Sequence, residues 1–473
     1  MPRVAFLTLG CDKNTVDSEK YLADVLAHGA TQVEDAADAD VVIVNTCGFI
    51  DAAKQESIDT IVAAGRLKAD GQVRAVFAIG CMIERHKAEL ADALPEIDCF
   101  LGTSETDRLV PELLERGLLD ADAYLAHPGT RLYAGDAPHV RYLKISEGCD
   151  HTCAFCAIPL MRGKHRSFAL DEIVREAQLL ELQGAREVSL VAQDLAHYGR
   201  DRRDGIGLPE LLEALVRETS IPWFRNLYLY SAGITPRLLE VIAAHPRILR
   251  YLDMPMQHGH DATLTRMRRP ERARTIREKV ALYRAAVPEL SIRTTCIVGF
   301  PGETDAEFDA LCELLEELRL DRVGVFTYSP QEGTRAMALA DDVPESVKYE
   351  RLERLTELQR SITAERYERW IGQQVRVLVD RPLDVDGLLE ARAPWQADGI
   401  DGVTWIEGAA AIAPAITAGT FVDVVIDEVV DDYDFRARLL GVADRPATAP
   451  RASRALPLAP AGAAPTTMGA FGR

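Results

Sequence analysis

Long apolar runs are missing from this 473-residue sequence, and so is the layout of a secretory signal at its start. A membrane-spanning helix needs about 18 or more consecutive apolar residues, and no stretch here approaches that length. The opening MPRVAFLTLGCDKN has only a short apolar run, which stops at Gly10-Cys11. These absences predict a cytoplasmic protein without a membrane partner.

Positive charge is also scarce. The chain has 54 Lys and Arg residues against 74 Asp and Glu residues, which gives a net charge of −20 and an isoelectric point near 5.0. An acidic body repels phosphate backbones, so a nucleic acid is disfavoured as the direct substrate. A basic protein partner suits this charge better.

A tight group of cysteines is present, but it lacks a fourth member. Cys149, Cys153 and Cys156, here called the clustered set, fall within EGCDHTCAFCAIPLMRG. Thiols stay reduced in the cytoplasm, so clustered cysteines indicate metal binding or catalysis rather than disulfides. Three thiolates can hold three irons of a four-iron cluster and leave the fourth iron open to a ligand. A structural zinc site with His151 as the fourth ligand is the alternative.

A second group of three cysteines is spread along the first 113 residues. This part alternates apolar runs with helix-like stretches, which predicts an open parallel α/β sheet. The runs RVAFLTLGC, DVVIVNTCGF and RAVFAIGCM indicate buried parallel strands, and they contain Cys11, Cys47 and Cys81 at or near their ends. We call these three the strand-end set. Carboxyl ends of parallel strands lie at one edge of a sheet, so these thiols can converge despite their spacing.

The remaining chain predicts two further domains, so the fold class is α/β with an added small β-barrel. After a linker over 114–138, six βα units over 139–369 predict a partial (β/α)6 barrel with its site at the carboxyl ends of the strands. Its strands are expected to begin at Val140, Arg186, Trp223, Arg250, Ser291 and Asp321. Residues 370–441 predict the small β-barrel, and the Ala/Pro-rich tail over 442–473 is expected to be disordered.

Eight motifs of this chain, in their order, resemble those of the radical S-adenosylmethionine methylthiotransferases. They are GCDKNTVDSE at Gly10, NTCGFI at Asn45, IGCM at Ile79, SEGCDHTCAFCAIPLMRG at Ser146, VAQDLAHYG at Val191, YLDMPMQH at Tyr251, IVGFPGETDAEF at Ile297 and VGVFTYSPQEGT at Val323. The domain order is similar too, with a three-cysteine N-terminal domain, a radical core and a C-terminal TRAM barrel. The resemblance covers about residues 1 to 441.

The resemblance implies a mechanism with two four-iron four-sulfur clusters and S-adenosylmethionine. The clustered set would hold the cluster that binds S-adenosylmethionine. An electron from a donor such as flavodoxin or ferredoxin would then generate a 5′-deoxyadenosyl radical. The strand-end set would hold an auxiliary cluster that carries the sulfur to be transferred. An unactivated C–H bond offers no handle for acid–base catalysis, which explains the need for a cofactor radical.

Within this family, the sequence resembles the members that modify the β-carbon of an aspartate in ribosomal protein S-twelve (uS12). Lys13-Asn14, the MRG that ends at Gly163, and Gln193-Asp194 carry this likeness. Members that methylthiolate adenosine in tRNA share every cysteine and are the alternative. A non-catalytic zinc or iron–sulfur binding module is a third hypothesis, and the motifs at the strand ends count against it.

Two glutamines and the charge of the last domain bear on the ligands. Gln193 and Gln257 lie just after predicted strand ends, where we expect contact with S-adenosylmethionine or substrate, and loop capping is the alternative. Between residues 371 and 440 there are 13 acidic residues and 5 arginines, a net charge of −8. A barrel that follows tRNA phosphates needs the opposite sign, whereas a basic ribosomal protein suits an acidic surface.

Overall fold

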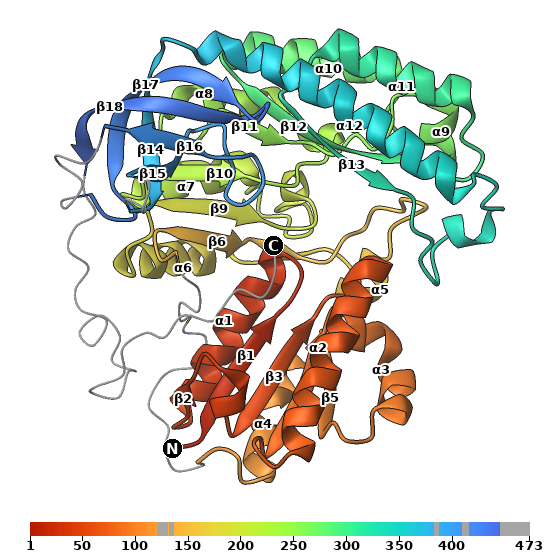
Figure 1. The fold of residues 1–473 in the computed structure, drawn as a ribbon, viewed down its shortest axis with the longest axis vertical. Coiled ribbons are helices and arrows are strands. Elements are labelled where there is room, and N and C mark those ends of the chain that lie inside the picture. Colours follow the sequence, from red (N-terminus) through yellow and green to blue (C-terminus); the bar gives the residue numbers. More distant parts are fainter. Residues whose placement is uncertain (121–130, 132–136, 383–386, 409–415, 445–473) are drawn as a thin grey trace.

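The computed structural model describes residues 1–120, 131, 137–382, 387–408 and 416–444, which form three units (Figure 1). The N-terminal unit, red to orange in Figure 1, lies below the central unit, and the blue C-terminal barrel packs beside β9 to β11. This arrangement confirms the predicted fold class. Most of the predicted linker, and the tail from residue 445, lie outside the described residues.

The N-terminal unit is a five-stranded parallel sheet in the order β2-β1-β3-β4-β5. Its elements are β1 (Arg3–Thr8), α1 (Asp12–Ala27), β2 (Thr31–Gln32), β3 (Val41–Thr46), α2 (Asp51–Ala69), β4 (Ala75–Gly80), α3 (Cys81–Ala93), β5 (Cys99–Gly102) and α4 (Leu109–Glu115). Both β3 and β4 are buried along their whole length, as expected for strands with helices on both faces. The three predicted strands are present, but each ends before its cysteine. Cys11 directly precedes α1, Cys47 directly follows β3, and Cys81 opens α3.

The central unit contains the six predicted parallel strands, divided between two sheets. The strands are β6 (Val140–Lys144), β9 (Glu187–Val191), β10 (Trp223–Asn226), β11 (Tyr251–Asp253), β12 (Ser291–Val298) and β13 (Arg322–Thr327). One sheet has the order β6-β9-β10 and the other β11-β12-β13, and Phe224 and Ile248 form an isolated parallel bridge between them. The partial barrel is therefore discontinuous between its third and fourth strands, which are its shortest.

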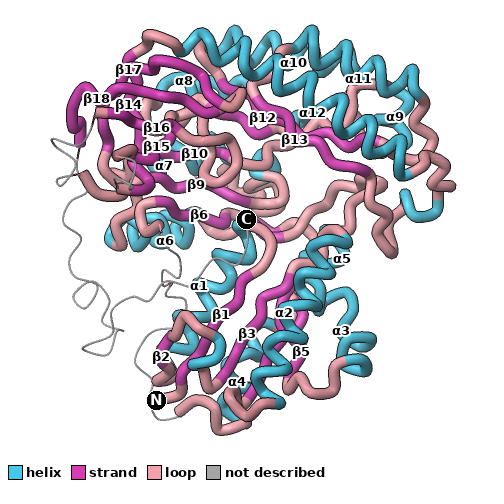
Figure 2. Tube along the Cα trace, viewed as in Figure 1, coloured by secondary structure: helices cyan, strands magenta, loops and turns pink. Residues whose placement is uncertain are grey.

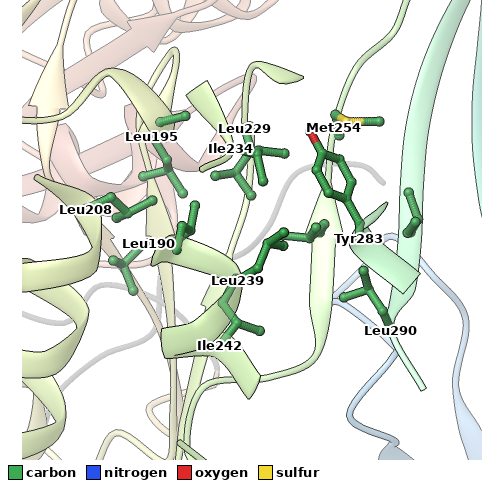
Figure 3. Close-up of a cluster of buried hydrophobic side chains, with 14 of the residues drawn as sticks. Leu190, Leu195, Leu208, Leu229, Ile234, Leu239, Ile242, Met254, Tyr283 and Leu290 are labelled. Carbon is green, nitrogen blue, oxygen red and sulfur yellow. The ribbon is translucent and has the colours of Figure 1, made fainter. Parts of the chain in front are cut away.

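Helices cover the outside of these strands. They are α6 (Leu170–Leu182), α7 (Leu208–Glu218), α8 (Pro236–Ala244), α9 (Asp261–Arg266), α10 (Ala273–Ala286), α11 (Asp305–Leu318) and α12 (Glu345–Tyr367). The short helix α5 (Ile158–Arg162) lies instead at the junction with the N-terminal unit. Figure 2 shows α10, α11 and α12 running along one side of β12 and β13. Apolar side chains fill the space between strands and helices, and Figure 3 shows Leu190 of β9 and Leu239 of α8 among them. A two-stranded ribbon, β7 (Ser146–Glu147) with β8 (Arg166–Ser167), flanks the loop of the clustered set.

The C-terminal unit is a closed five-stranded barrel, as predicted. Its strands are β14 (Gln374–Arg381), β15 (Leu389–Arg392), β16 (Thr404–Glu407), β17 (Phe421–Val430) and β18 (Asp434–Asp444). The barrel closes because β17 pairs with both β14 and β18. The strand β18 continues to Asp444, three residues beyond the predicted domain boundary at 441.

The N-terminal and central units face each other with the carboxyl ends of their strands. Helix α1 packs against β6, and α3 packs against α5. This apposition brings the segments that carry the two cysteine sets together, although Cys11 and Cys156 are 145 residues apart in the sequence. In the part of the chain that the structure describes, no helix combines the length and the apolar character that crossing a bilayer requires.

Candidate active site

A cavity of about 490 Å³ lies between the N-terminal and central units. Its lining includes all six cysteines singled out from the sequence, namely Cys11, Cys47, Cys81, Cys149, Cys153 and Cys156, together with Gln193 and Gln257. Other lining residues follow β10 and β11 or belong to β12 and β13 of the central unit. The cavity therefore lies at the carboxyl ends of both sets of strands, where parallel α/β folds place their sites.

Asn14 holds the strand-end set together. Its side-chain amide donates to the carbonyl of Leu9 after β1 over 2.8 Å and to that of Thr46 at the end of β3 over 3.0 Å. Its side-chain oxygen accepts from the Cys81 thiol over 3.8 Å. Asn14 is fully buried in the first turn of α1, so one side chain joins the ends of three neighbouring strands.

Gly10 allows the first two thiols of this set to approach. Its backbone has φ +91°, and a Cβ at this position would lie 2.6 Å from Cβ and 2.8 Å from Sγ of Cys47. Only glycine adopts this conformation without strain and leaves room for that contact. Cys47 is held in turn by Ser57, whose hydroxyl accepts from the Cys47 N–H and donates to its carbonyl, both over 3.0 Å.

The clustered set lies on a loop that backbone hydrogen bonds fix at both sides. The N–H of Cys149 donates to the carbonyl of Gly163 over 3.1 Å, and that of Ala154 donates to the carbonyl of Met267 over 2.9 Å. At Gly148, with φ +77°, an added Cβ would lie 2.1 Å from the carbonyl oxygen of Lys164, so the two ends of the loop pack backbone against backbone. The loop is thus closed at its base and open toward the cavity.

His151, the fourth ligand of the zinc alternative, already has partners other than the thiols. One ligand atom each of His151, Asp194 and His197 lie within 4.8 Å of one another. His151 also has Nε2 at 2.7 Å from Asp194 and stacks on the ring of Tyr230 at 3.9 Å. The alternative of a zinc site closed by His151 is therefore disfavoured.

Burial keeps most of these thiols protonated until a metal binds. It raises the pKa of both Cys81 and Cys156 to about 12 and that of Cys149 to about 11, and it also raises the pKa of Cys47. Neighbouring thiols of the same set add to each shift, since two thiolates repel each other. Metal binding must therefore displace these protons.

Both predicted glutamines line the cavity and have a side-chain oxygen without a hydrogen-bond partner. The side-chain oxygens of Gln193 and Gln257 are buried without a hydrogen-bond partner, while the Gln193 amide donates to Glu147 over 3.1 Å. Gln257 also has φ +73°, a conformation that costs a non-glycine residue about 1 to 3 kcal/mol. Orphaned buried acceptors beside six thiols fit a site that binds a polar ligand next to its metal clusters.

Four cations beside the thiols were given no role in the site by the sequence. They are Lys13, Arg162, Arg269 and Arg293, all of which line the cavity of this acidic protein. The Arg162 Nε donates to Cys81 Sγ over 3.2 Å, and Arg269 Nη1 donates to Cys153 Sγ over 3.7 Å. Metal-bound thiolates carry negative charge, so buried cations here suit metal sites. The sequence did contain a signal for Arg162, because the MRG motif that includes it closely follows the clustered set.

A (β/α)6 unit with three cysteines on the loop after its first strand defines a radical S-adenosylmethionine protein. Family models agree with each unit: residues 3–102 match the uncharacterized protein family UPF0004, residues 143–315 the radical SAM superfamily, and residues 371–440 the TRAM domain. Membership of the radical SAM superfamily implies a four-iron cluster and S-adenosylmethionine.

Similar sequences identify the family within that superfamily. The chain is 42% identical over 472 residues to the ribosomal protein uS12 methylthiotransferase RimO of Anaeromyxobacter sp. (strain K), covering 99% of this chain and 98% of that protein. It is 40% identical to the protein of the same name from Desulforudis audaxviator, covering 93% and 97% of the two chains. The chain belongs to this RimO family of radical SAM methylthiotransferases, which confirms the resemblance seen in the motifs.

Solved structures agree at the level of the fold. The radical S-adenosylmethionine methyltransferase TsrM from Kitasatospora setae, with tryptophan and a S-adenosylmethionine analogue bound, superposes with a TM-score of 0.52. It is 14% identical and covers 70% of this chain and 75% of its own. A likeness at this identity supports the radical SAM fold and nothing about the substrate.

Proposed function

We propose that this chain transfers a methylthio group to the β-carbon of an aspartate in ribosomal protein uS12. The observation that carries the proposal is the single cavity lined by both cysteine sets. A sulfur-inserting enzyme needs its source of radicals and its source of sulfur beside one substrate carbon, and a shared cavity supplies that proximity. The name of the relatives, which cover nearly the whole chain, supports uS12 as the substrate.

In this proposal the clustered set holds the four-iron cluster that binds S-adenosylmethionine, and the strand-end set holds an auxiliary four-iron cluster. When bound, these groups supply the reductive cleavage of S-adenosylmethionine and the sulfur that is transferred. The chain's own residues bind and orient. Gln193 and Gln257 offer acceptors to the bound S-adenosylmethionine, and apolar lining residues such as Phe49 and Phe155 limit the access of water.

The partners follow from charge and chemistry. A net charge of −8 over 371–440 favours a basic protein over the phosphates of tRNA, so we propose that nucleic acid is not the direct substrate. The reaction needs single electrons, and a flavodoxin or ferredoxin is the proposed donor. The reduced thiols and a ribosomal substrate together favour the cytoplasm.

The test is a reconstituted reaction. Anaerobically reconstituted full-length protein is incubated with S-adenosylmethionine, a reductant and small ribosomal subunits, with tRNA in a parallel reaction. Mass spectrometry is expected to find a methylthio group on an aspartate of uS12 and none on tRNA. Cys47→Ala and Cys153→Ala should each abolish the product, whereas Cys312→Ala, which removes a buried thiol in α11, should retain it. Methylthio groups on tRNA adenosine alone would establish the alternative substrate instead.

A further inference from the structure

Each cysteine set has one buried guanidinium in contact with one of its thiols. Arg162 Nε lies 3.2 Å from Cys81 Sγ, and Arg269 Nη1 lies 3.7 Å from Cys153 Sγ. The two arginine side chains are only 6% and 3% exposed. Arg269 comes from the same unit as the thiol that it contacts. Arg162 does not, because it ends α5 of the central unit while Cys81 opens α3 of the N-terminal unit.

Arg162 belongs to the loop of the clustered set. Helix α5 begins at Ile158, two residues after Cys156, and Arg162 is its last residue. The side chain therefore extends from the segment that carries one proposed cluster to a thiol of the other. This is the only guanidinium contact to a thiol of the strand-end set among the hydrogen bonds of the described residues.

The other nitrogens of Arg162 are already occupied, which aims Nε at the sulfur. Nη1 donates to Asp17 over 2.7 Å and to Glu147 over 3.1 Å, and Nη2 donates to Asn14 over 2.5 Å. A guanidinium holds its donors in a rigid planar fork, so fixing both terminal nitrogens fixes the direction of Nε–H. A lysine in this place offers charge but no such fixed direction.

Holding the two units together does not require the contact with sulfur. Lys144 of β6 already pairs with Asp17 of α1, and Arg85 of α3 donates to Gln331 over 3.2 Å and to the carbonyl of Glu332 over 2.9 Å. These contacts join the same two units without touching a thiol. The Nε–H···S contact of Arg162 thus needs another explanation.

We propose that Arg162 is a positioning residue of the auxiliary site that raises the reduction potential of a cluster held by the strand-end set. This inference rests on the proposed function, since it needs a cluster at these cysteines. A reduced cluster carries one more negative charge than an oxidised one. A positive charge and an N–H···S hydrogen bond at one ligand sulfur therefore stabilise the reduced form more. Arg162 lies at the end of the segment that carries the clustered set. A shift of that segment would therefore also change the reduction potential of the auxiliary cluster.

The experiment isolates the auxiliary site in the full-length chain. The clustered set is replaced by alanine (Cys149→Ala, Cys153→Ala and Cys156→Ala), the protein is reconstituted anaerobically, and iron is counted. The midpoint potential is then followed by electron paramagnetic resonance. Arg162→Gln is expected to bind the same iron and to shift the midpoint to more negative potential. Arg162→Lys keeps the charge without the directed Nε–H, so its midpoint potential should lie between those of the starting protein and of Arg162→Gln.

Arg85→Gln is the matched control. It removes an arginine in the same helix as Cys81 that also joins the two units, but this arginine contacts no sulfur. Relative to the starting protein, the midpoint potential of Arg85→Gln should shift less than half as much as that of Arg162→Gln. An equal shift in both variants would show a general charge effect and overturn the proposal.

The remaining outcomes are also decisive. If Arg162→Gln binds iron with an unchanged midpoint, the proposal is wrong. If Arg162→Gln loses iron, the midpoint potential of Arg162→Lys alone is compared with that of the starting protein. An unchanged midpoint potential in Arg162→Lys then overturns the proposal. Loss of iron from both variants means that Arg162 builds the site and does not set its potential, which also overturns it. If the starting protein binds no iron, the auxiliary cluster itself is refuted, and the iron count alone reveals that result.

Discussion

Arg392 of the C-terminal barrel donates to Glu187 of the central sheet over 2.6 Å, and neither side chain is more than 1% exposed. Arg225 of β10 donates to the other oxygen of the same carboxylate, also over 2.6 Å. Glu187 is the first residue of β9, so the barrel docks at the end of the strand opposite to the cavity. One buried carboxylate with two guanidinium partners thus helps to attach the barrel at the end of β9 that lies away from the cavity.

Removing this carboxylate should weaken the docking strongly. Glu187→Gln removes the counter-charge of the buried Arg225 and leaves Arg392 with Asp380 as its close partner, and breaking a buried pair in this way costs about 3 to 5 kcal/mol. Urea unfolding followed by tryptophan fluorescence suits the measurement, because Trp370 and Trp395 stack at 3.8 Å in the barrel. Glu428→Gln is the control, since its pair with Arg436 is about half exposed and should contribute less than about 1 kcal/mol. Equal effects of the two variants would contradict this account.

A second contact at the same junction should make stability depend on pH. Burial alone would raise the pKa of Asp380, but the charge of Arg392 and the hydrogen bond with His139 outweigh burial and hold that pKa at about 2. The folded-state pKa lies below the ordinary value of 3.8, so the ionised carboxylate stabilises the fold fully above about pH 4. This contribution is lost as the pH falls through 2.

Asp380→Asn measures that contribution. At pH 6 the free energy of unfolding of the parent should be about 2 kcal/mol larger than that of this variant. This difference corresponds to the lowering of the Asp380 pKa from 3.8 to about 2. The difference should shrink steadily between about pH 4 and pH 2. A difference that stays constant over this range would show that the asparagine acts by packing and not through ionisation.

The elements that position the site could largely be predicted from the sequence. The strands of the N-terminal and central units are apolar runs between helix-like segments, and their carboxyl ends share an edge in any parallel sheet. This rule is enough to predict that Cys11, Cys47 and Cys81 converge. It could not show that Cys11 and Cys47 lie just beyond their strands and that Cys81 opens a helix, because periodicity reports burial and not the last paired residue.

Contacts between distant segments were beyond prediction. Arg162 and Cys81 are 81 residues apart, and Arg269 and Cys153 are 116 apart. No local pattern marks either pair, since the first depends on how two folded units dock and the second on how distant segments of one unit pack. The break in the central sheet was hidden for a similar reason. The apolar run WFRNLYLYS continues past Asn226, where pairing stops, and Tyr228 within it adopts φ +62°.

Gly10 should be essential for iron binding at the strand-end set. Gly10→Ala places a Cβ 2.6 Å from Cβ of Cys47, at a backbone position with φ +91°. We expect the variant to lose the iron of this set and to keep that of the clustered set. Gly71→Ala is the matched control, because Gly71 also has positive φ, at +77°, but nothing lies within 4 Å of its added Cβ. Full iron content in Gly10→Ala would show that the two thiols need not be so close.

Iron content should separate the two sets. Reconstituted parent protein is expected to bind about eight irons, on the basis of one four-iron cluster at each set. Replacing all three cysteines of either set by alanine should leave about four, and Cys296→Ala should change nothing, since that thiol is buried within β12 away from the cavity lining. Iron analysis together with visible absorption makes the measurement. Stoichiometric zinc without visible absorption would argue for a structural site.

The two glutamines should contribute to the affinity for S-adenosylmethionine. Gln193→Ala and Gln257→Ala each remove a buried acceptor that has no partner within the protein, and a hydrogen bond of this kind contributes about 0.5 to 1.5 kcal/mol. We expect the Kd for S-adenosylmethionine to rise about threefold to tenfold in each variant. Alanine at 257 keeps the cost of the positive φ, so this comparison isolates the side chain. Gln359→Ala is the control, because Gln359 also has an unpaired buried oxygen but belongs to α12, and its Kd should equal that of the parent. Titration calorimetry on reconstituted protein measures all three, and an unchanged Kd in both cavity variants would assign these glutamines to loop structure.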